Sequence, residues 1–398
     1  MSELDGTVAT ERMVVNIGPS HPITHGTLRL QLELEGETVV RSACEIGYLH
    51  RGFEKQAENC FYQVVIPYTE RLNYMSPVAN SNAWCHAVEQ LLGVEDQVPP
   101  RAQAIRVITT EMARIIDHCV CIGTNLVDLG ALTNFWYLYG YREKMYDLYD
   151  ELCGARMMVN YPRIGGVCLD LPDGWTDKLV KVLADMEEVI ADVGGLVQHN
   201  RIFLDRTMGV GVIDLETAKS HGFTGPCLRA LGVPLDLRKA QPYWGYEQYE
   251  FDVPVGTEGD TYRRVMLRFA ELEQSRRIIL QAVDRLPDGP VLMDHPEIAL
   301  PPKDKVYNTM EGLIHHFKLV MHGVSPDAGE IYSATEGANG ELGFYIVSDG
   351  SPQAYRVRIR PPCFANYTAF PKMINGGQLA DVAAALGSIN VIAGELDR

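Results

Sequence analysis

The segment NIGPSHPITHG, residues 16–26, holds two histidines four positions apart. On a helix this spacing would place both imidazoles on one face, as metal ligands often require. Two prolines within the segment exclude a regular helix, and its two glycines are typical of a loop. His21 and His25 are therefore predicted to lie in a stiff loop, with either a structural or a chemical role.

Two further segments combine side chains that could do chemistry with an ordinary structural alternative. In YTERLNYMSP, residues 68–77, we expect Arg71 and Tyr74 on one helical face, where a plain amphipathic helix is the alternative. In LVDLGAL, residues 126–132, Asp128 lies among apolar residues. A buried carboxylate needs a partner, and a histidine would serve. The residue types therefore allow a His–Asp–Tyr constellation.

A small sheet is predicted to carry the histidine loop. Residues 12–18 and 27–34 have strand patterns, the second with leucine at alternate positions, and residues 39–47 predict a returning third strand. The histidine loop would then connect the first two strands. Loops held by a rigid sheet commonly carry functional residues.

Long helices are predicted from about residue 53. The clearest spans 100–129, where apolar residues recur at spacings of three and four, after two prolines and before a glycine. The residues off this apolar seam are Arg101, Glu111, Arg114, Asp117 and His118. Further helices are predicted at 66–92, 131–152, 173–199, 258–285 and 305–322. Strands are predicted at 330–335, 342–348 and 355–360, before a helix at 379–389.

These elements predict an α+β fold, in which a long-helix bundle is combined with a small N-terminal β-sheet and a C-terminal strand-containing region. Residues 1–11 are expected to be a flexible N-terminus. Residues 12–398 are expected to form a single integrated domain. Its parts would be an N-terminal sheet (12–52), a helical bundle (53–325) and a C-terminal α+β part (326–398).

The composition excludes several classes of protein. A net charge of −17, from 52 acidic and 35 basic residues, argues against a nucleic-acid partner. No apolar run is long enough for a membrane span and no secretory signal is present, so a cytoplasmic protein is expected. Nine scattered cysteines fit reduced thiols, with Cys119 and Cys121 buried rather than bound to metal. His315 and His316 are expected at the surface or in packing. No motif predicts that this chain itself binds ATP, NAD or a metal.

Seven collinear motifs resemble one family. NIGPSHPITHGTLRL, IGYLHRGFEK, PPRAQAIRV, GARMMVNYPRIGGV, LRKAQPY, GELGFYIVSDG and the final GELDR look like the D subunits of the proton-pumping NADH:quinone oxidoreductase, respiratory complex I. The resemblance covers about residue 12 to Arg398. This family is similar in fold to the large subunit of nickel–iron hydrogenases, which hold their metals with a CxxC near each end. This chain has neither pair, so a hydrogenase centre is not expected.

The resemblance implies a quinone headgroup pocket formed with a small iron–sulfur subunit above the membrane. In such a pocket His25 and Tyr74 would hydrogen-bond the two quinone carbonyls, and Asp128 would partner the histidine. The binding surroundings would further include His21, Arg51 and Arg71, the two arginines being close to the terminal iron–sulfur cluster. NAD(H) would bind elsewhere in the complex, and other peripheral-arm and membrane-arm subunits would be partners. The chain would be a peripheral protein on the cytoplasmic side of the membrane.

These residue types suit quinone reduction, which takes two electrons and two protons. A bare dianion in a low-dielectric pocket is very unfavourable, so donors at each carbonyl would stabilise it and deliver protons. A tyrosine, with a reference pKa of about 10, donates only to a strongly basic oxygen. A histidine beside a carboxylate can be positively charged near neutral pH. Loss of its proton would leave Asp128 without an ionic partner, a candidate first step of coupling to proton pumping.

One departure from the family pattern bears on the acceptor. Met158 stands where many relatives have a histidine near the terminal cluster. A thioether cannot take up a proton when the cluster is reduced. A low-potential, weakly pH-dependent cluster and menaquinone as acceptor are therefore expected. Three alternatives remain: a homologous complex that takes electrons from ferredoxin or reduced deazaflavin, a scaffold without chemistry, and a hydrogenase-like metal enzyme.

Overall fold

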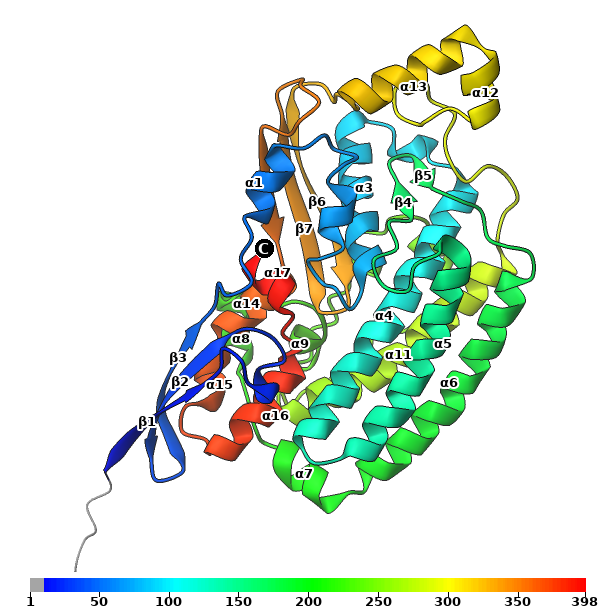
Figure 1. Ribbon diagram of the computed structural model, residues 1–398. Coiled ribbons are helices and arrows are strands. Elements are labelled where there is room, and N and C mark those ends of the chain that lie inside the picture. The colour runs from blue at the N-terminus through cyan, green and yellow to red at the C-terminus, as the bar shows by residue number, and fades with distance from the viewer. Residues whose placement is uncertain (1–10) are drawn as a thin grey trace, which may run out of the picture.

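The computed structural model describes residues 11–398 (Figure 1). Helices are combined with three small antiparallel sheets, which confirms the predicted α+β class. Of the segment 1–11, for which flexibility is predicted, residues 1–10 lie outside the described part of the chain.

The N-terminal sheet has the three predicted strands, β1 (Arg12–Ile17), β2 (Arg29–Glu35) and β3 (Thr38–Glu45), in that order. The leucines at alternate positions of β2 are buried on one face. They belong to an apolar cluster that includes α15 (Phe370–Ile374) and α16 (Leu379–Ile389), so the two ends of the chain pack together (Figure 1). The histidine loop connects β1 and β2, and includes the short helix η1 (Pro22–Thr24).

Four long helices form the body of the molecule: α4 (Pro100–Asp128), α5 (Leu132–Cys153), α6 (Trp175–Gln198) and α11 (Thr261–Asp284) (Figure 1). α4 is central and packs against α5, α11, α16 and α3 (Pro77–Leu92). Its seam is apolar as predicted, and Cys119 and Cys121 are buried in it. The polar residues off the seam are also buried, with the exception of Arg101.

Buried ion pairs join α4 to the elements around it. Glu111 of α4 accepts hydrogen bonds from Arg238 at 3.1 Å. Arg229 donates to Glu271 of α11 at 2.7 Å and to Glu336 at 2.8 Å. Removing one partner from such a pair would leave an uncompensated buried charge, so the network strongly constrains where α4 and α11 lie.

The C-terminal sheet contains β6 (Gly329–Gly337), β7 (Gly340–Ser348) and β8 (Arg356–Arg360), again in chain order. It packs against α3 and against α1 (Phe53–Glu58). The chain then ends with α14 (Pro362–Thr368), α15, α16 and α17 (Ala393–Asp397). The other elements are α7 (Arg201–Thr207), α8 (Leu215–Ser220), α9 (Gly225–Arg229), α10 (Leu237–Ala240), β4 (Pro162–Arg163), β5 (Gly166–Val167), η2 (Glu95–Gln97) and η3 (Tyr246–Gln248).

Two predicted helices are each divided in the structure. The helix expected at 66–92 is wrong: α2 (Ile66–Thr69) ends early, and α3 begins only at Pro77. A proline disfavours helical backbone in the residue before it, and Ser76 accordingly has φ −125°. The helix expected at 305–322 breaks at Thr309 into α12 (Lys303–Asn308) and α13 (Met310–His322). Thr309 caps α13 by accepting the N–H of Gly312 at 3.1 Å.

Candidate functional site

The histidine loop is held by its own side chains. His21 precedes η1, and its Nδ1 accepts the N–H of Ile23 at 3.2 Å. Buried Thr24 places its hydroxyl 2.7 Å from the carbonyl oxygens of both His21 and Gly26. His21 is exposed, so the structure gives it a capping contact and no contact with the other predicted site residues.

His25 and Asp128 lie together although they are 103 residues apart. The Nε2 atom of His25 is 2.5 Å from an Oδ atom of Asp128, the last residue of α4. The two side chains are 17% and 10% exposed. The partner expected for this aspartate is therefore supplied by the histidine loop. Because Nε2 is occupied, Nδ1 is the ring nitrogen left for a ligand.

Tyr74 lies in the turn 70–76 between α2 and α3. The expectation that Arg71 and Tyr74 share a helical face is therefore wrong, because no helix forms there. Tyr74 is half-buried, and burial is the main cause that raises its pKa above the ordinary value of a phenol. The nearby Cys363 and Asp117 raise the pKa further, whereas the hydrogen bond from the backbone N–H of Ala393 lowers it. The raised pKa means that the phenol keeps its proton at neutral pH.

The start of α17 lies between the histidine loop and the Tyr74 turn. A Cβ atom added to Gly26 would be 3.0 Å from the Cβ atom of Ala393. A Cβ atom added to Gly394 would be 3.3 Å from a ring carbon of Tyr74. Both halves of the candidate site therefore contact the same two-residue segment, and its small side chains permit this close approach.

Arg51 and Arg71 form the basic side of this region. The Arg51 guanidinium donates to the carbonyl oxygen of Arg71 at 2.9 Å. Burial and the neighbouring Arg71 charge lower the pKa of Arg51 from its ordinary value. Arg71 itself donates to the carbonyl oxygen of Pro67 and lies 3.7 Å from the Glu70 carboxylate. The structure therefore brings these two predicted residues together.

Glu70 is a buried acid that the sequence interpretation did not single out. Its Oε1 atom accepts the N–H of Asn160 at 2.6 Å, and burial raises its pKa to about 7. Asn160 has φ +42° and belongs to the same connection as Met158. Glu70 therefore ties this connection to the Arg71 turn. The signal was an acid beside Arg71 between two prolines, which the helical interpretation treated as a solvated face.

Asp117 is a second acid whose position was not predicted. It is fully buried, and its carboxylate accepts hydrogen bonds from Asn73 at 2.8 Å, Ser76 at 2.9 Å and Asn390 at 2.7 Å. These bonds join α4 to the Tyr74 turn and to the end of α16. These three donors satisfy the buried carboxylate.

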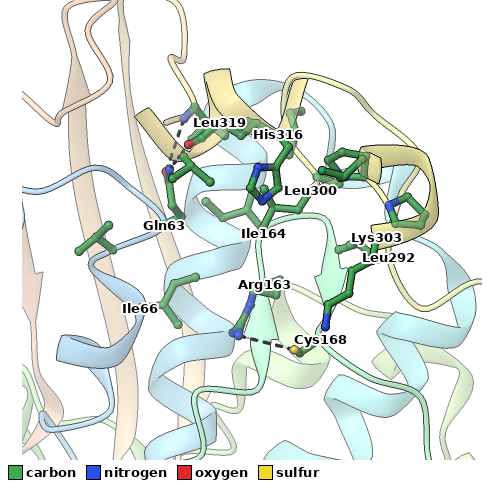
Figure 2. Close-up of a pocket in the computed structure, with 18 of the residues that line it drawn as sticks. Gln63, Ile66, Arg163, Ile164, Cys168, Leu292, Leu300, Lys303, His316 and Leu319 are labelled. Carbon is green, nitrogen blue, oxygen red and sulfur yellow. Dashed lines mark hydrogen bonds between the residues drawn. The ribbon is translucent and has the colours of Figure 1, made fainter. Parts of the chain in front are cut away.

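A large cleft lies elsewhere, between α2, β4 and the α12–α13 pair (Figure 2). Its volume is about 940 Å³ and most of its lining is apolar. Figure 2 shows Arg163 beside Cys168, 3.6 Å apart, and His316 on the far wall. None of the six predicted site residues lines this cleft. His316, expected at the surface or in packing, is half-buried in the wall of this cleft.

A family model described as "Respiratory-chain NADH dehydrogenase, 49 Kd subunit" matches residues 128–398. The D subunit of the NADH-quinone oxidoreductase of Myxococcus xanthus is 48% identical over 397 residues, a match that covers 100% of this chain to the nearest per cent and 95% of the relative. The chain belongs to this family. The corresponding D subunit of Geotalea uraniireducens is 48% identical over 98% of this chain and 100% of the relative. The C/D subunit of Bdellovibrio bacteriovorus is 53% identical over 96% of this chain and 68% of the relative.

Membership makes this chain a subunit of a respiratory oxidoreductase, and the other subunits of that complex are its partners. Its redox activity belongs to the assembly. No helix among residues 11–398 combines the length and the apolar character needed to cross a bilayer.

Proposed function

We propose that this chain forms, with a small iron–sulfur partner subunit, the site where the quinone headgroup is bound and reduced. The observation that carries the proposal is the Asp128–His25 hydrogen bond, with the histidine loop and the Tyr74 turn both next to the 393–394 segment. Two donors brought near one segment suit a ligand with two carbonyl oxygens at opposite ends of a ring. The family is similar in fold to nickel–iron hydrogenase large subunits, but this chain lacks their metal ligands. A quinone pocket in place of the hydrogenase metal site would fit both observations.

His25 and Tyr74 would act as hydrogen-bond donors and then as proton donors. Asp128 fixes the ring of His25 and leaves Nδ1 for one quinone oxygen. Burial keeps the Tyr74 hydroxyl protonated until the second oxygen becomes strongly basic. When His25 gives up its proton, Asp128 loses its ionic partner at the end of a 29-residue helix. This change of charge is our proposed start of coupling to proton translocation.

Electrons would arrive from the partner's terminal cluster. Arg51 and Arg71 supply positive charge where that reduced cluster would lie, and exposed His21 would lie in the same binding surroundings. The thioether of Met158 cannot bind a proton on reduction, which favours a low-potential cluster and menaquinone as acceptor. NADH would be oxidised elsewhere in the complex, and the names of the three relatives favour it as donor. The chain would lie on the cytoplasmic side of the membrane.

A two-subunit pocket also explains why the cleft of Figure 2 is lined by none of the predicted site residues. The partner subunit would supply the missing wall, so one chain alone would present only half of the cavity.

Tyr74→Phe in the assembled complex tests the proposal. We expect quinone reduction to fall by about 100-fold, the usual contribution of a proton donor. NADH oxidation by a hydrophilic acceptor that bypasses the quinone site should be unchanged. Tyr355→Phe, which changes a 71% exposed tyrosine, is the matched control. A normal rate of quinone reduction in both Tyr74→Phe and His25→Ala would remove these residues from the proposed role.

A further inference from the structure

One face of α4 carries a stripe of polar side chains, formed by Asp117, Cys121, Asn125 and Asp128. Their spacing on a regular helix places all four within about 80° of one another around the axis. The first three are buried and Asp128 is half-buried. Each of the four makes a hydrogen bond to another part of the chain, so this face of α4 holds its neighbours by specific contacts.

The middle of the stripe holds α16, which lies against α4 (Figure 1). The Asn125 amide donates to the carbonyl oxygen of Ala384 at 3.2 Å, and the Cys121 sulfur is 3.7 Å from the carbonyl oxygen of Gly387. A Cβ atom added to Gly387 would be 2.5 Å from Nδ2 of Asn125, so the two helices approach closely. α16 is therefore held in one register on α4.

Asp117, at one end of the stripe, holds the Tyr74 turn by a residue on each side of the tyrosine. Its Oδ2 atom accepts the Asn73 amide at 2.8 Å and the Ser76 hydroxyl at 2.9 Å. Its Oδ1 atom accepts the amide of Asn390, the residue that ends α16, at 2.7 Å. Because Tyr74 lies in a turn and not in a helix, the contacts of its neighbours largely set where the phenol lies.

Asp128, at the other end of the stripe, holds His25. Asp117 and Asp128 are eleven residues apart on one continuous helix. This separation is about three turns, so the two residues point in directions only about 20° apart and lie about 16 Å apart along the axis. From these ends the histidine loop and the Tyr74 turn both reach the 393–394 segment. α4 thus carries both halves of the proposed site on one face.

We propose that Asp117 is a positioning residue for quinone reduction, which holds Tyr74 at the distance from His25 that a quinone ring requires. The inference rests on the proposed quinone site and adds the residue that sets its geometry. Asp117 acts through Asn73 and Ser76 and does not itself bind the quinone. Loss of an acceptor at this position would let the turn move while Asp128 still holds His25. A misplacement of about 1 Å can cost about 100-fold in rate.

Asp117→Asn in the assembled complex is the first test, made in the unmodified chain and together with Tyr74→Phe. The asparagine presents an N–H donor to groups that are themselves donors, so quinone reduction should fall by about 10- to 100-fold in the unmodified chain. In the Tyr74→Phe chain the further fall should be less than about twofold, because Asp117 acts through the hydroxyl that this chain lacks. Equal factors in the two chains would overturn the proposal.

The other half of the site gives the converse expectation. In a His25→Ala chain, Asp117→Asn should keep the same factor of about 10- to 100-fold, because Asp117 and Asp128 hold separate donors. Loss of this factor in the His25→Ala chain would contradict separate attachment of the two donors to α4.

An exchange of the two groups provides a rescue. Asn73→Asp combined with Asp117→Asn again places a donor opposite an acceptor, so the rate should recover at least about threefold over Asp117→Asn alone. A general loss of packing would not be repaired in this way. No recovery would show that the bond between these two side chains does not position Tyr74.

The matched control is Glu89→Gln, because Glu89 is another fully buried acid, with hydrogen bonds to Arg106 at 2.6 Å and to the N–H of Gly165. It should lower the midpoint of chemical denaturation and change quinone reduction by less than about twofold. A loss of rate as large as that of Asp117→Asn, with the same dependence on Tyr74, would show that the effect is not specific to the Tyr74 turn.

Ser76→Ala keeps the test decisive if Asp117→Asn does not assemble, since it removes one of the three bonds and leaves the carboxylate in place. We expect a loss of about threefold or more in the unmodified chain and none in the Tyr74→Phe chain. Full activity in Tyr74→Phe alone would reject the proposed quinone site itself. Loss of activity in Tyr74→Phe, with equal factors for Ser76→Ala in both chains, would reject the positioning role alone.

Discussion

At the scale of single residues, the His25–Asp128 pair is the feature on which the proposed chemistry depends. The 2.5 Å contact between the two side chains holds the imidazole, and the position of Asp128 at the end of α4 sets the orientation of the ring. An uncharged amide would keep the shape of the side chain and lose the ionic partner of His25. The charge, rather than the space that Asp128 fills, should therefore govern the rate.

Asp128→Asn is expected to lower the rate of quinone reduction by about 10- to 100-fold, because both the orientation of His25 and its electrostatic support are weakened. Steady-state assays of the assembled complex with a soluble quinone analogue would measure the change. Asp147→Asn, at a 76% exposed side chain of α5, serves as the control. An Asp128→Asn complex as fast as this control would show that the carboxylate is dispensable.

The sequence predicted that a buried Asp128 would need a partner, because the cause is local, whereas the family resemblance implied that His25 is this partner. Asp128 lies among apolar neighbours, and the cost of burying a carboxylate holds whatever the fold, so a partner could be expected. Asp117, Glu70 and Glu395 were not predicted as buried. Their burial depends on which distant segments cover them, and α4 shows this most clearly, because its polar side packs against other elements and not against water.

At the scale of elements, the strands and the long helices could be predicted from periodicity, and the Tyr74 turn could not. The apolar spacing within 66–92 suits a helix almost throughout, but Pro77 starts a new helix and leaves residues 70–76 as a turn. The same proline is therefore what places Arg71 and Tyr74 near α17. A pattern of hydrophobicity does not distinguish a proline that begins a helix from a proline that ends one.

The segment that enters α17 sets the spacing between the two halves of the site. A Cβ atom on Gly394 would be 2.4 Å from the carbonyl oxygen of Arg71 and 2.7 Å from that of Leu72, so backbone would have to move. Gly394→Ala should lower the free energy of unfolding by about 1–3 kcal/mol and impair quinone reduction more than NADH oxidation by a bypassing acceptor.

The matched control for this substitution is Gly140→Ala in α5. A Cβ atom on Gly140 would meet nothing within 4 Å, and alanine in a helix interior is favoured over glycine by about 1 kcal/mol. Chemical denaturation of the full chain would measure both variants. Equal stability of the two alanine variants would show that the 393–394 segment is not closely packed against its neighbours.

At the scale of the whole molecule, the site is assembled from four distant parts of the chain. A loop of the N-terminal sheet, the end of α4, the turn before α3 and the C-terminal helix α17 meet there (Figure 1). The ion-pair network around α4 and α11 fixes where α4 lies among its neighbours. Before the structure, a meeting of residues 25, 74 and 128 was implied by family resemblance alone, because no local pattern brings them together, and the part played by residue 394 was not predicted.

The surface of the chain fits an assembly. Large apolar side chains of α12 and α13 are exposed beside the cleft of Figure 2, with Tyr307 at 81%, Met310 at 74% and Phe317 at 58% exposure. An isolated soluble protein seldom exposes such a contiguous group. Membership of a respiratory complex accounts for it, since partner subunits must cover part of the chain.

The most direct measurement is a structure of the assembled complex with quinone bound. We predict that the ring lies between His25 and Tyr74, with one carbonyl oxygen within hydrogen-bond distance of His25 Nδ1 and the other within reach of the Tyr74 hydroxyl. A headgroup bound instead in the cleft beside Arg163 and His316, or held by only one of the two donors, would contradict the account.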